Sequence, residues 1–501
     1  MRTGADYRES LRDGRKVWVM GAGRVEDMTT HPATRRTVEE YAAWYDRHRD
    51  PAWQDTLWPP AGVKRTGPWA FALPQTSADV VGMGRSFAAT LFHSAGNITH
   101  DPAYGNLIAL GVLSCVQGLN GAQSENARYA MAYRDGIVRD QRFITYCGGA
   151  PIIGQRLNPD PAKRVALKLV RETDAGVIIR GRLGMHTSPA YAEEIYIGGM
   201  SGVDIDGKRA GFIVPVGGAG VTTLCRKAAT RDPNPFISPL SSRFDELDGQ
   251  MWLDDVFVPW ERVFFVGANP DPISRWLRWH HLYGWLAKSE FSLGLALALA
   301  DAMGLKEQDP TIEYIVDLIV PVQTVRACLT AAERDPQFTE AGYCYPSHRH
   351  LAAGGIALFD ARQRISEILR ILPGSSLVVA PADTDLATPE LAAGLEESFA
   401  GGGYSAKQRA ALLQLAWDHV SSALDARESA FELHASGGMP NWRGWLRQNF
   451  RDYNELANGV LRAIELPMPT VDVDNIRTMP ITRRRFAAAA GDQFPPATGR
   501  T

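Results

Sequence analysis

The stretch FDELDGQMWLDDVFVPWERVFF, residues 244–265, lies where the sequence changes from strand-like to helical character. It has the β-branched and aromatic residues of a strand, and it ends in two acids, Asp254 and Asp255, followed by Pro259 and Trp260. Proline has no backbone N–H to donate, so Pro259 predicts the end of the strand. We therefore expect this strand to lead the chain out of a β domain and into a helical one.

The regions on either side of this stretch differ in periodicity. Apolar residues recur at helical spacing over residues 1–141, after a short opening hairpin, and again over 271–480. Residues 142–270 contain short strand-like runs separated by Gly, Asp and Pro turns. These patterns predict an N-terminal mostly helical domain, a central β domain of barrel or sandwich type and a C-terminal helical bundle. Residues 481–501 are rich in Ala, Gly and Pro and are expected to form a loose tail.

Composition limits the classes of partner. The chain has 501 residues, 45% of them hydrophobic and 22% charged, with a formal net charge of −3, so neither nucleic acid nor a membrane surface is expected to bind it. Its cysteines are far apart, without a CxxC or CxxxC pair, which argues against a disulfide framework, a zinc ribbon or an iron–sulfur site. The first residues lack the apolar core of a signal peptide. We expect a cytoplasmic protein.

Two motifs suggest a ligand but lack the rest of the pattern. KVWVMGAGRVEDMTTHP contains a GxG after a strand, yet the third glycine is absent and no helix start follows, so a hairpin is predicted and no nicotinamide cofactor. CYPSHRH brings Cys344, His348 and His350 together without a fourth ligand nearby. We therefore predict no metal site.

Other short motifs carry polar or aromatic residues suited to contacting a planar ligand. They are HDPAYG with His100 and Tyr104, RFITYCGGAP with Tyr146, GMHTSPA with His186, Thr187 and Ser188, and RWLRWHHLYGW with His280 and His281. Adjacent residues on a helix point about 100° apart, so at most one of the two consecutive histidines is expected to face a given pocket. Each motif alone is also compatible with ordinary turn chemistry or with a buried structural histidine.

Taken together, the motifs resemble one family. The matching stretches are SLRDGRKVWVMGAGRVEDMTTHPA, LKLVRETDAGVIIRGRLGMHTSPA and PLSSRFDELDGQMWLDDVFVPWERV, which occur in the family's order between about residues 9 and 470. The sequence is similar to the oxygenase component of two-component 4-hydroxyphenylacetate 3-monooxygenases. The resemblance implies an α+β, acyl-CoA dehydrogenase-like fold with an N-terminal helical domain, a central β-barrel and a C-terminal four-helix bundle. It also implies that residues 244–265 close the barrel and that Pro259 and Trp260 steer the chain into the bundle.

The resemblance implies a chemistry and its partners. Members take reduced FAD (FADH2) from a separate flavin reductase, add O2, and hydroxylate a phenolic or other electron-rich small aromatic substrate through a flavin hydroperoxide. The assembly expected from the family is a homotetramer or a homodimer.

The resemblance also assigns site residues. Flavin contacts carried over to this sequence are Tyr146, Cys147, Gly148, Ile152, Gln155, Thr187, Ala435, Ser436, Gly437 and Gly438. Substrate contacts carried over are His100, Tyr104, Tyr146 and Ser201. The family's phenol hydroxylases have an arginine, a tyrosine four residues later and a histidine at the following strand, whereas this chain has His100, Tyr104 and Tyr146 at those positions.

These departures have a chemical consequence. His100 lacks the fixed charge and the bidentate fork of arginine, and Tyr146, which titrates near ~10 when unperturbed, is no base at neutral pH. We hypothesise that His281, or His280, supplies the missing base. We also hypothesise that the substrate is larger or differently charged than 4-hydroxyphenylacetate.

Other classes of function remain open at this point. The same fold hosts FAD-dependent dehydratases and isomerases that use an iron–sulfur cluster, but HDPAY stands where the cluster's cysteine pair is needed. A member with redirected chemistry, such as non-phenol oxygenation, and a non-catalytic flavin-binding paralogue are the remaining alternatives.

Overall fold

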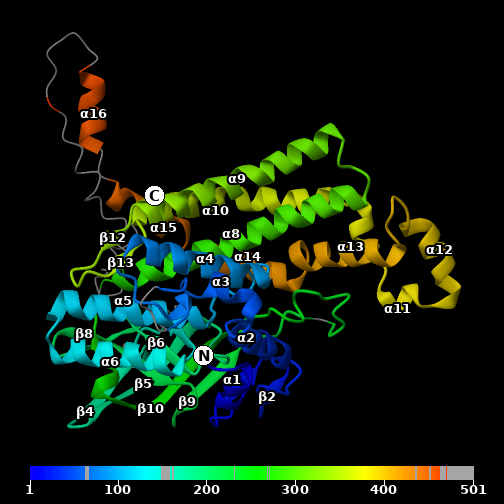
Figure 1. The fold of residues 1–501 in the computed structure, drawn as a ribbon. Helices are drawn as coiled ribbons and strands as arrows, with labels where there is room; N and C mark the ends of the chain where they lie inside the picture. The colour runs from blue at the N-terminus through cyan, green and yellow to red at the C-terminus, as the bar shows by residue number, and fades with distance from the viewer. Residues whose placement is uncertain are drawn as a thin grey trace, which may run out of the picture.

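The computed structural model describes residues 1–62, 67–147, 158–160, 163–230, 232–267, 269, 271–434, 437–450, 453–462 and 470. The predicted tail, 481–501, lies outside these residues. In Figure 1 the sheets lie at the bottom of the molecule, with α1, α2, α5 and α6 beside and above them, and the long C-terminal helices form a layer at the top. The layers share one hydrophobic core in the described part of the chain.

The described residues of the N-terminal region form six α-helices. They are α1 (Gly4–Ser10), α2 (Arg35–Arg47), α3 (Gln54–Leu57), α4 (Ser77–His93), α5 (Pro102–Asn120) and α6 (Glu125–Asp140). Asp101 caps the start of α5 by accepting a hydrogen bond from the Tyr104 amide. Most of α5 is buried, and it packs between α6 and the first helix of the C-terminal layer.

The described strands form two main sheets that contact each other through β3 with β5 and through β8 with β10. One has the order β2-β1-β9-β10-β5-β4, and the other has the order β11-β8-β6-β3 with β7 paired to β8. The strands are β1 (Val17–Val19), β2 (Gly23–Val25), β3 (Ile144–Cys147), β4 (Lys168–Thr173), β5 (Gly176–Thr187), β6 (Glu194–Ile197), β7 (Val203–Ile205), β8 (Lys208–Pro215), β9 (Val221–Cys225), β10 (Asp248–Pro259) and β11 (Val263–Phe265).

The two acids near the end of β10 form a β-bulge. The register of β10 against β5 shifts between Leu253 and Val256, and Asp255 has a φ of 53°. Arg182 Nη1 lies 2.8 Å from Asp254 Oδ1, and Arg180 forms an ion pair with Asp255. The acids therefore mark a bulge on the exposed side of the strand.

The path after β10 differs from the prediction. Pro259 ends the strand, and Trp260 begins a single 3-10 turn, Trp260–Arg262, which leads into β11 at the edge of the second sheet. The helical bundle begins only after β11. The dipeptide therefore moves the chain from one sheet to the other, and the expectation that it steers the chain directly into the bundle is wrong.

The hairpin predicted at the GxG motif is confirmed as β1 and β2. The sequence did not predict that β1 also pairs in parallel with β9, with Trp18 opposite Leu224. A segment from the mostly helical N-terminal region thus becomes part of the six-stranded sheet. The sequence could not indicate this pairing, because the partner strand lies about 200 residues further along the chain.

The C-terminal layer centres on α8 (Asp271–Ala302), α9 (Asp309–Arg334), α10 (His348–Ile371) and α13 (Ala406–Val420). The small hairpin β12 (Gln337–Phe338) and β13 (Cys344–Tyr345) joins α9 to α10, and α11 (Asp383–Leu386) and α12 (Pro389–Phe399) lie at the right-hand end in Figure 1. The helices α14 (Ala423–His434), α15 (Gly438–Asn449) and α16 (Tyr453–Leu461) follow. Contacts of α8 with α4 and α5 connect this layer to the N-terminal helices.

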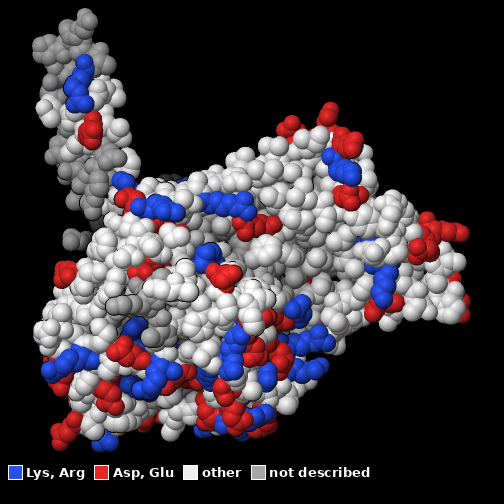
Figure 2. Space-filling view, in the orientation of Figure 1, with Lys and Arg blue, Asp and Glu red and all other residues white. Residues whose placement is uncertain are grey.

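Surface character differs between the layers. Figure 2 shows basic and acidic side chains mixed over the sheets and around α1 and α2, whereas much of the bundle face in this view carries none. Two helices, α5 and α9, are long and apolar enough to cross a membrane by length and composition. The apolar window of α5 is 78% buried inside this fold, whereas that of α9 is 33% buried, so α9 has an apolar outer face.

Candidate active site

Three of the residues predicted to contact substrate or act as catalysts form a buried ring cluster. His100 precedes α5, Tyr104 lies in its first turn, and His281 extends from α8, which packs against α5. The His100 and Tyr104 ring centroids are 4.4 Å apart, and the His281 centroid lies 5.4 Å from Tyr104 and 5.5 Å from His100. The cluster is closed to solvent, with Tyr104 only 1% exposed.

The neighbouring histidine has a different partner. His280 Nε2 lies 3.1 Å from Asp101 Oδ1, and Trp44 Nε1 donates to Asp101 Oδ2 at 2.9 Å. Burial alone raises the pKa of Asp101, but His280 and the hydrogen bonds outweigh it and hold that pKa below its ordinary value. An ionised carboxylate only accepts, so His280 donates from Nε2. Asp101 thereby fixes α8 against the start of α5 and leaves His281 facing His100.

Glu246 holds the backbone of His100 directly and its ring through Thr99. This fully buried carboxylate accepts hydrogen bonds from the Thr99 amide, from Thr99 Oγ1 at 3.2 Å and from the His100 amide at 2.7 Å. Its Oε2 also lies 3.6 Å from His100 Nδ1. The hydrogen-bond partner of Nδ1 is Thr99 Oγ1, at 3.1 Å. Because Thr99 Oγ1 gives its one hydrogen to Glu246, Nδ1 donates to Thr99, and Nε2 is on the opposite edge of the ring.

Burial sets the ionisation of the other rings. Burial, with lesser contributions from His100 and His280, lowers the pKa of His281 well below its ordinary value, so its imidazole is neutral near pH 7. Burial also raises the pKa of Tyr104, and the Tyr146 hydroxyl raises it further. The pKa of Tyr146 is likewise raised by burial. Both phenols are neutral hydroxyl groups.

Tyr146 and Cys147, at the end of β3, are predicted to contact flavin. The Tyr146 ring stacks on Tyr196 of β6 with centroids 5.7 Å apart and an interplanar angle of 21°. Its strand, β3, packs against α5, the helix that carries Tyr104. The structure therefore places the predicted flavin strand β3 next to the predicted substrate residues.

Thr187, the last residue of β5, lies opposite Asp248 in the ladder with β10. Its hydroxyl donates to Asp248 Oδ1 at 3.0 Å. Arg427 of α14 donates to both oxygens of Asp248, from Nη2 at 2.6 Å and from Nε at 2.7 Å, and Arg226 Nε donates at 2.9 Å. These two guanidinium groups outweigh burial and lower the pKa of Asp248, so it is a carboxylate.

The remaining predicted contacts are partly outside the described residues, which include neither Gly148, Ile152 and Gln155 nor Ala435 and Ser436. Ser201 is buried in the turn after β6, and its Oγ has no hydrogen-bond partner among the described residues. Gly437 and Gly438, at the start of α15, have φ values of +82° and +68°. A Cβ at Gly437 would collide with the Asn441 side chain, so glycine is required there.

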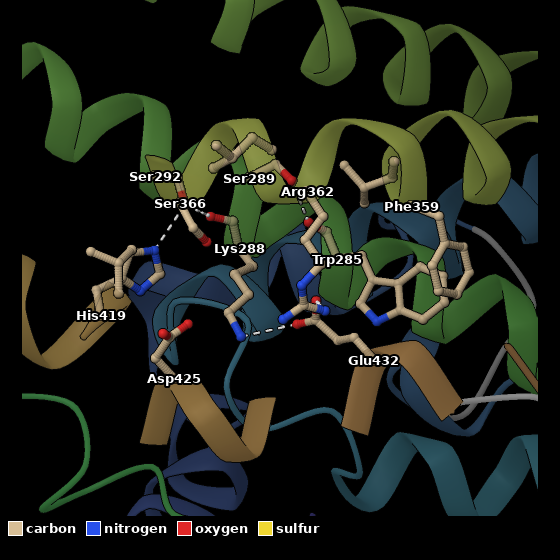
Figure 3. A pocket seen from close by; sticks show the side chains of 13 residues that line it. Trp285, Lys288, Ser289, Ser292, Phe359, Arg362, Ser366, His419, Asp425 and Glu432 are labelled. Atoms are coloured by element: carbon tan, nitrogen blue, oxygen red, sulfur yellow. Dashed lines mark hydrogen bonds and ion pairs between the residues drawn. The ribbon is translucent and has the colours of Figure 1, made fainter. Parts of the chain in front are cut away.

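A separate pocket opens inside the helical layer. It is lined from α8, α10, α13 and α14, with none of the described predicted site residues among its walls. Figure 3 shows Lys288 reaching Glu432 and His419 reaching Ser292 across it. Trp285 separates it from the ring cluster, because this residue lines the pocket while its ring stacks on His281 with centroids 6.4 Å apart.

The layers and the buried site between them define the class of protein. A crystal structure of the oxygenase component (HpaB) of 4-hydroxyphenylacetate 3-monooxygenase complexed with FAD matches with a TM-score of 0.83 at 28% identity, covering 92% of this chain and 98% of that chain. This match confirms the predicted α+β, acyl-CoA dehydrogenase-like fold.

Sequence comparison then assigns the family. Residues 3–265 match the family described as 4-hydroxyphenylacetate 3-hydroxylase N terminal, and residues 275–462 match 4-hydroxyphenylacetate 3-hydroxylase C terminal. The chain belongs to this 4-hydroxyphenylacetate 3-hydroxylase family, as its motifs predicted. The 4-hydroxyphenylacetate 3-monooxygenase oxygenase component of Thermus thermophilus is 30% identical over 445 residues, 86% of this chain and 91% of that protein. The FADH(2)-dependent monooxygenase TftD of Burkholderia cepacia is 27% identical over 410 residues, 76% of each protein.

The described residues fit a flavin. A flavin ring has carbonyl and N–H groups along one edge, and the hydroxyl of Thr187, a predicted flavin contact, is a buried partner of the right chemistry. Ser201, predicted to contact substrate, has a buried Oγ without a partner in the described part of the chain, and a bound group would satisfy this polar atom. The positive φ values of Gly437 and Gly438 let the backbone at the start of α15 approach a ligand without side chains between them.

Reasoning from the sequence did not find the charged residues behind the predicted contacts. These are Asp101, Glu246, Asp248 and Arg427. The acids of FDELDG could have been noticed, because Glu246 and Asp248 lie in a segment otherwise read as strand and core. Nothing in the sequence indicates that Arg427, about 180 residues later, is their partner.

Proposed function

We propose that the protein is the oxygenase component of a two-component flavin-dependent monooxygenase. In this proposal it receives FADH2 from a separate reductase and hydroxylates a small phenolic or other electron-rich aromatic compound. Membership of the 4-hydroxyphenylacetate 3-hydroxylase family supports it, as does the crystal structure with FAD that shares the fold. Reduced FAD, if bound there, would supply the two electrons with which O2 gives one oxygen atom to the ring and the other to water.

The observation that carries the proposal is the buried pair of His100 and Glu246. A phenol becomes more reactive towards an electrophilic oxygen when a base hydrogen-bonds or removes its hydroxyl proton. The Nε2 edge of His100 is turned away from Glu246, and the carboxylate 3.6 Å from Nδ1 would stabilise the imidazolium that results. We assign His100 as the base, supported from behind by Glu246.

The other rings take complementary roles. His281 is neutral and can accept a hydrogen bond, but its lowered pKa means that it does not retain a proton. We therefore assign His281 and Tyr104 to orienting the ring, rather than His281 to proton abstraction. Tyr146 contributes a neutral hydroxyl on the flavin side. The burial of the cluster would exclude water from the reaction.

We infer that the substrate differs from 4-hydroxyphenylacetate. The positions corresponding to the family's arginine and histidine are His100 and Tyr146, so the charge available to hold the phenol is not fixed. The pocket behind Trp285, with Lys288 and Glu432 in its walls, would give a larger or charged substituent room if that ring turned aside. Efficient hydroxylation of 4-hydroxyphenylacetate without peroxide release would contradict this inference.

The protein is also proposed to act in the cytoplasm as a homotetramer or homodimer, without nucleic acid or membrane partners. The outer face of α9 supports the assembly, because Ile312, Val316, Ile319 and Val320 are exposed along one side of it. Covering an apolar stripe of this kind with a second copy of the chain removes it from water.

The test compares hydroxylated product with H2O2 released, using FADH2 supplied by a reductase and a panel of phenols. The wild type should couple product to FADH2 for at least one phenol. Glu246→Gln keeps the shape but removes the charge behind His100, so its hydroxylation rate should fall about a hundredfold while peroxide rises. The matched control is Glu261→Gln, at an exposed position just after β10. Peroxide without product from the wild type on every phenol would overturn the proposed function, and normal coupling in Glu246→Gln would overturn the assignment of the base.

A further inference from the structure

The pocket inside the helical layer lies along the same face of α8 as the ring cluster. Trp285 follows His281 by four residues, and its ring stacks on that histidine. The next two turns of α8 line the pocket with Lys288, Ser289 and Ser292. Residues three or four apart on a helix are neighbours on one face. The pocket therefore continues the proposed substrate site along α8, with the Trp285 ring as the partition between them.

The Trp285 ring is held by packing and not by a hydrogen bond in the described part of the chain. Its Nε1 is buried without a partner there, and Phe359 and Trp442 pack on the ring with centroids 5.2 Å away. The wall behind it is apolar where Leu358 and Ile365 of α10 line the pocket. A ring held in this way turns at the cost of dispersion contacts that another apolar group restores. An alkyl chain attached to the ring of a substrate would provide such contacts while it passes Trp285.

His419 supplies an unsatisfied acceptor to the pocket. Ser292 Oγ donates its only hydrogen to the Lys288 carbonyl at 2.8 Å, so His419 Nε2, also 2.8 Å from that hydroxyl, is the donor in their contact. Burial lowers the pKa of His419 to about 3, so the ring is neutral and Nδ1 has only a lone pair. The side chain is 4% exposed, and Nδ1 has no partner among the described residues. In Figure 3 this nitrogen lies on the side of the ring towards Asp425.

The other groups with spare capacity in the pocket are also acceptors. Ser289 Oγ donates to the Trp285 carbonyl at 2.9 Å, which leaves its lone pairs free. Asp425 accepts from Arg370 Nη2 at 2.9 Å and from Ser429 Oγ at only 3.4 Å. Burial raises the pKa of Asp425 in spite of the neighbouring cations, so its charge is stabilised incompletely.

The cations in the pocket walls already have carboxylate partners. Lys288 Nζ donates to Glu428 at 3.0 Å and to Glu432 at 2.9 Å. Arg362 forms an ion pair with Glu432 and donates to Ser429 Oγ at 3.1 Å. An anion entering the pocket would have to displace these carboxylates. A group that brings its own hydrogens and a positive charge instead finds acceptors that are not yet satisfied.

We propose that the aromatic substrate carries a primary ammonium group at the end of a flexible chain, and that this group binds in the pocket at Asp425 and His419. The inference rests on the proposed function, which places the aromatic ring beside His100 and His281. From His281 to Ser289 the helix rises by about 12 Å. A chain of about six to eight bonds spans the distance that remains beyond the ring.

The test is a series of 4-hydroxyphenyl alkylamines of increasing chain length, each compared with the alcohol and the carboxylic acid of the same length. Calorimetry measures their dissociation constants for the protein saturated with oxidised FAD. With chains of about six to eight bonds, the amine should bind about tenfold tighter than the alcohol, and the acid more weakly than either. With the short chain of tyramine, the amine and the alcohol should bind alike, because the ammonium group does not pass Trp285.

A substitution assigns the ammonium group to its partner. Asp425→Asn keeps the shape of the side chain but removes its charge, so the preference for the long amine over the alcohol should fall from about tenfold to about twofold or less. The matched control is Asp317→Asn, because Asp317 also forms an ion pair with an arginine, Arg364, at 2.9 Å, but does not line the pocket. This control should keep the tenfold preference. Thermal melting of each variant checks its folding, and the chain-length series in the wild type decides the question if Asp425→Asn does not fold.

The outcomes separate this inference from the proposed function. An amine that binds no tighter than the alcohol at every chain length would overturn the inference, even in a protein that hydroxylates phenols with FADH2 from a reductase. A preference unchanged in Asp425→Asn would overturn the assignment to this carboxylate. A protein that hydroxylates no phenol of the series, nor any simpler one, would overturn the proposed function and with it the inference about its substrate.

Discussion

The buried histidines make the stability of the fold sensitive to mild acid. Burial lowers the pKa of His48 and of His186 to about 4 and that of His419 to about 3. Each is thus neutral in the folded protein down to a pH far below the ordinary value of 6.5. On unfolding, each takes up a proton at any pH below about 6.5, so acid favours the unfolded state.

The magnitude follows from proton linkage. Each of these three histidines should lower the free energy of unfolding by about 2 kcal/mol between pH 7 and pH 5. Together they should lower it by about 5–6 kcal/mol. Glu333 acts in the opposite direction, because burial raises its pKa to about 7 even though Tyr283 and Trp279 donate to it. The protonated Glu333 contributes stability that is fully present below 4.5, its pKa in the unfolded chain, and that is lost as pH rises through 7. Lowering the pH from 7 to 5 therefore raises the free energy of unfolding by about 2 kcal/mol through Glu333. The net expected loss from these four groups is about 3 kcal/mol, and His281, whose pKa burial also lowers, adds to it in the same direction.

Urea denaturation at pH 7 and at pH 5, followed by tryptophan fluorescence, measures this difference. Glu333→Gln removes the opposing contribution, so its loss of stability between the two pH values should exceed that of the wild type by about 2 kcal/mol. The matched variant His186→Gln should instead lose about 2 kcal/mol less than the wild type. A wild type equally stable at both pH values, or a Glu333→Gln variant with the same pH dependence as the wild type, would refute the reasoning.

Two further predictions concern the frame of the site and the assembly. Asp101→Asn should lower the free energy of unfolding by about 1–3 kcal/mol, because the buried His280 loses its carboxylate partner. Urea denaturation measures this change. An unchanged midpoint would show that the pair does not hold α8 against α5. Val320→Glu, on the exposed apolar face of α9, should lower the molar mass of the assembly measured by light scattering. The control Ser398→Glu, at an exposed position of α12, should leave that mass unchanged. Equal masses for the two variants would argue against this face of α9 as the subunit contact.

Local patterns in the sequence predicted the elements and several neighbours well. The family motif predicted that His100 and Tyr104, four residues apart, both contact substrate, and their rings lie 4.4 Å apart although the helix begins only at Pro102. The hairpin at the GxG motif followed from its turn residues alone. Such features depend on a few consecutive residues, which is why a single sequence suffices for them.

Features that depend on distant parts of the chain were not predicted. The parallel pairing of β1 with β9 and the return of the chain through β11 follow from how the two sheets close on each other. Glu246 reaches the His100 amide across 146 residues of sequence, and the side chains that hold it are not adjacent to any motif of the family. Spacing alone carries no information about partners so far apart.

The stretch that ends in the bulge of β10 begins with the segment that holds the site together. Glu246 and Asp248 are two residues apart, and in extended backbone such residues point to the same side. Both indeed reach Arg427, whose Nη2 lies 3.5 Å from Glu246 Oε2 and 2.6 Å from Asp248 Oδ1. One carboxylate holds His100 on the proposed substrate side and the other orients Thr187 on the proposed flavin side. Arg427, from the helix that leads to Gly437 and Gly438, therefore ties both sides to the bundle. A residue inserted between the two acids would turn one of them away and separate the two halves of the site.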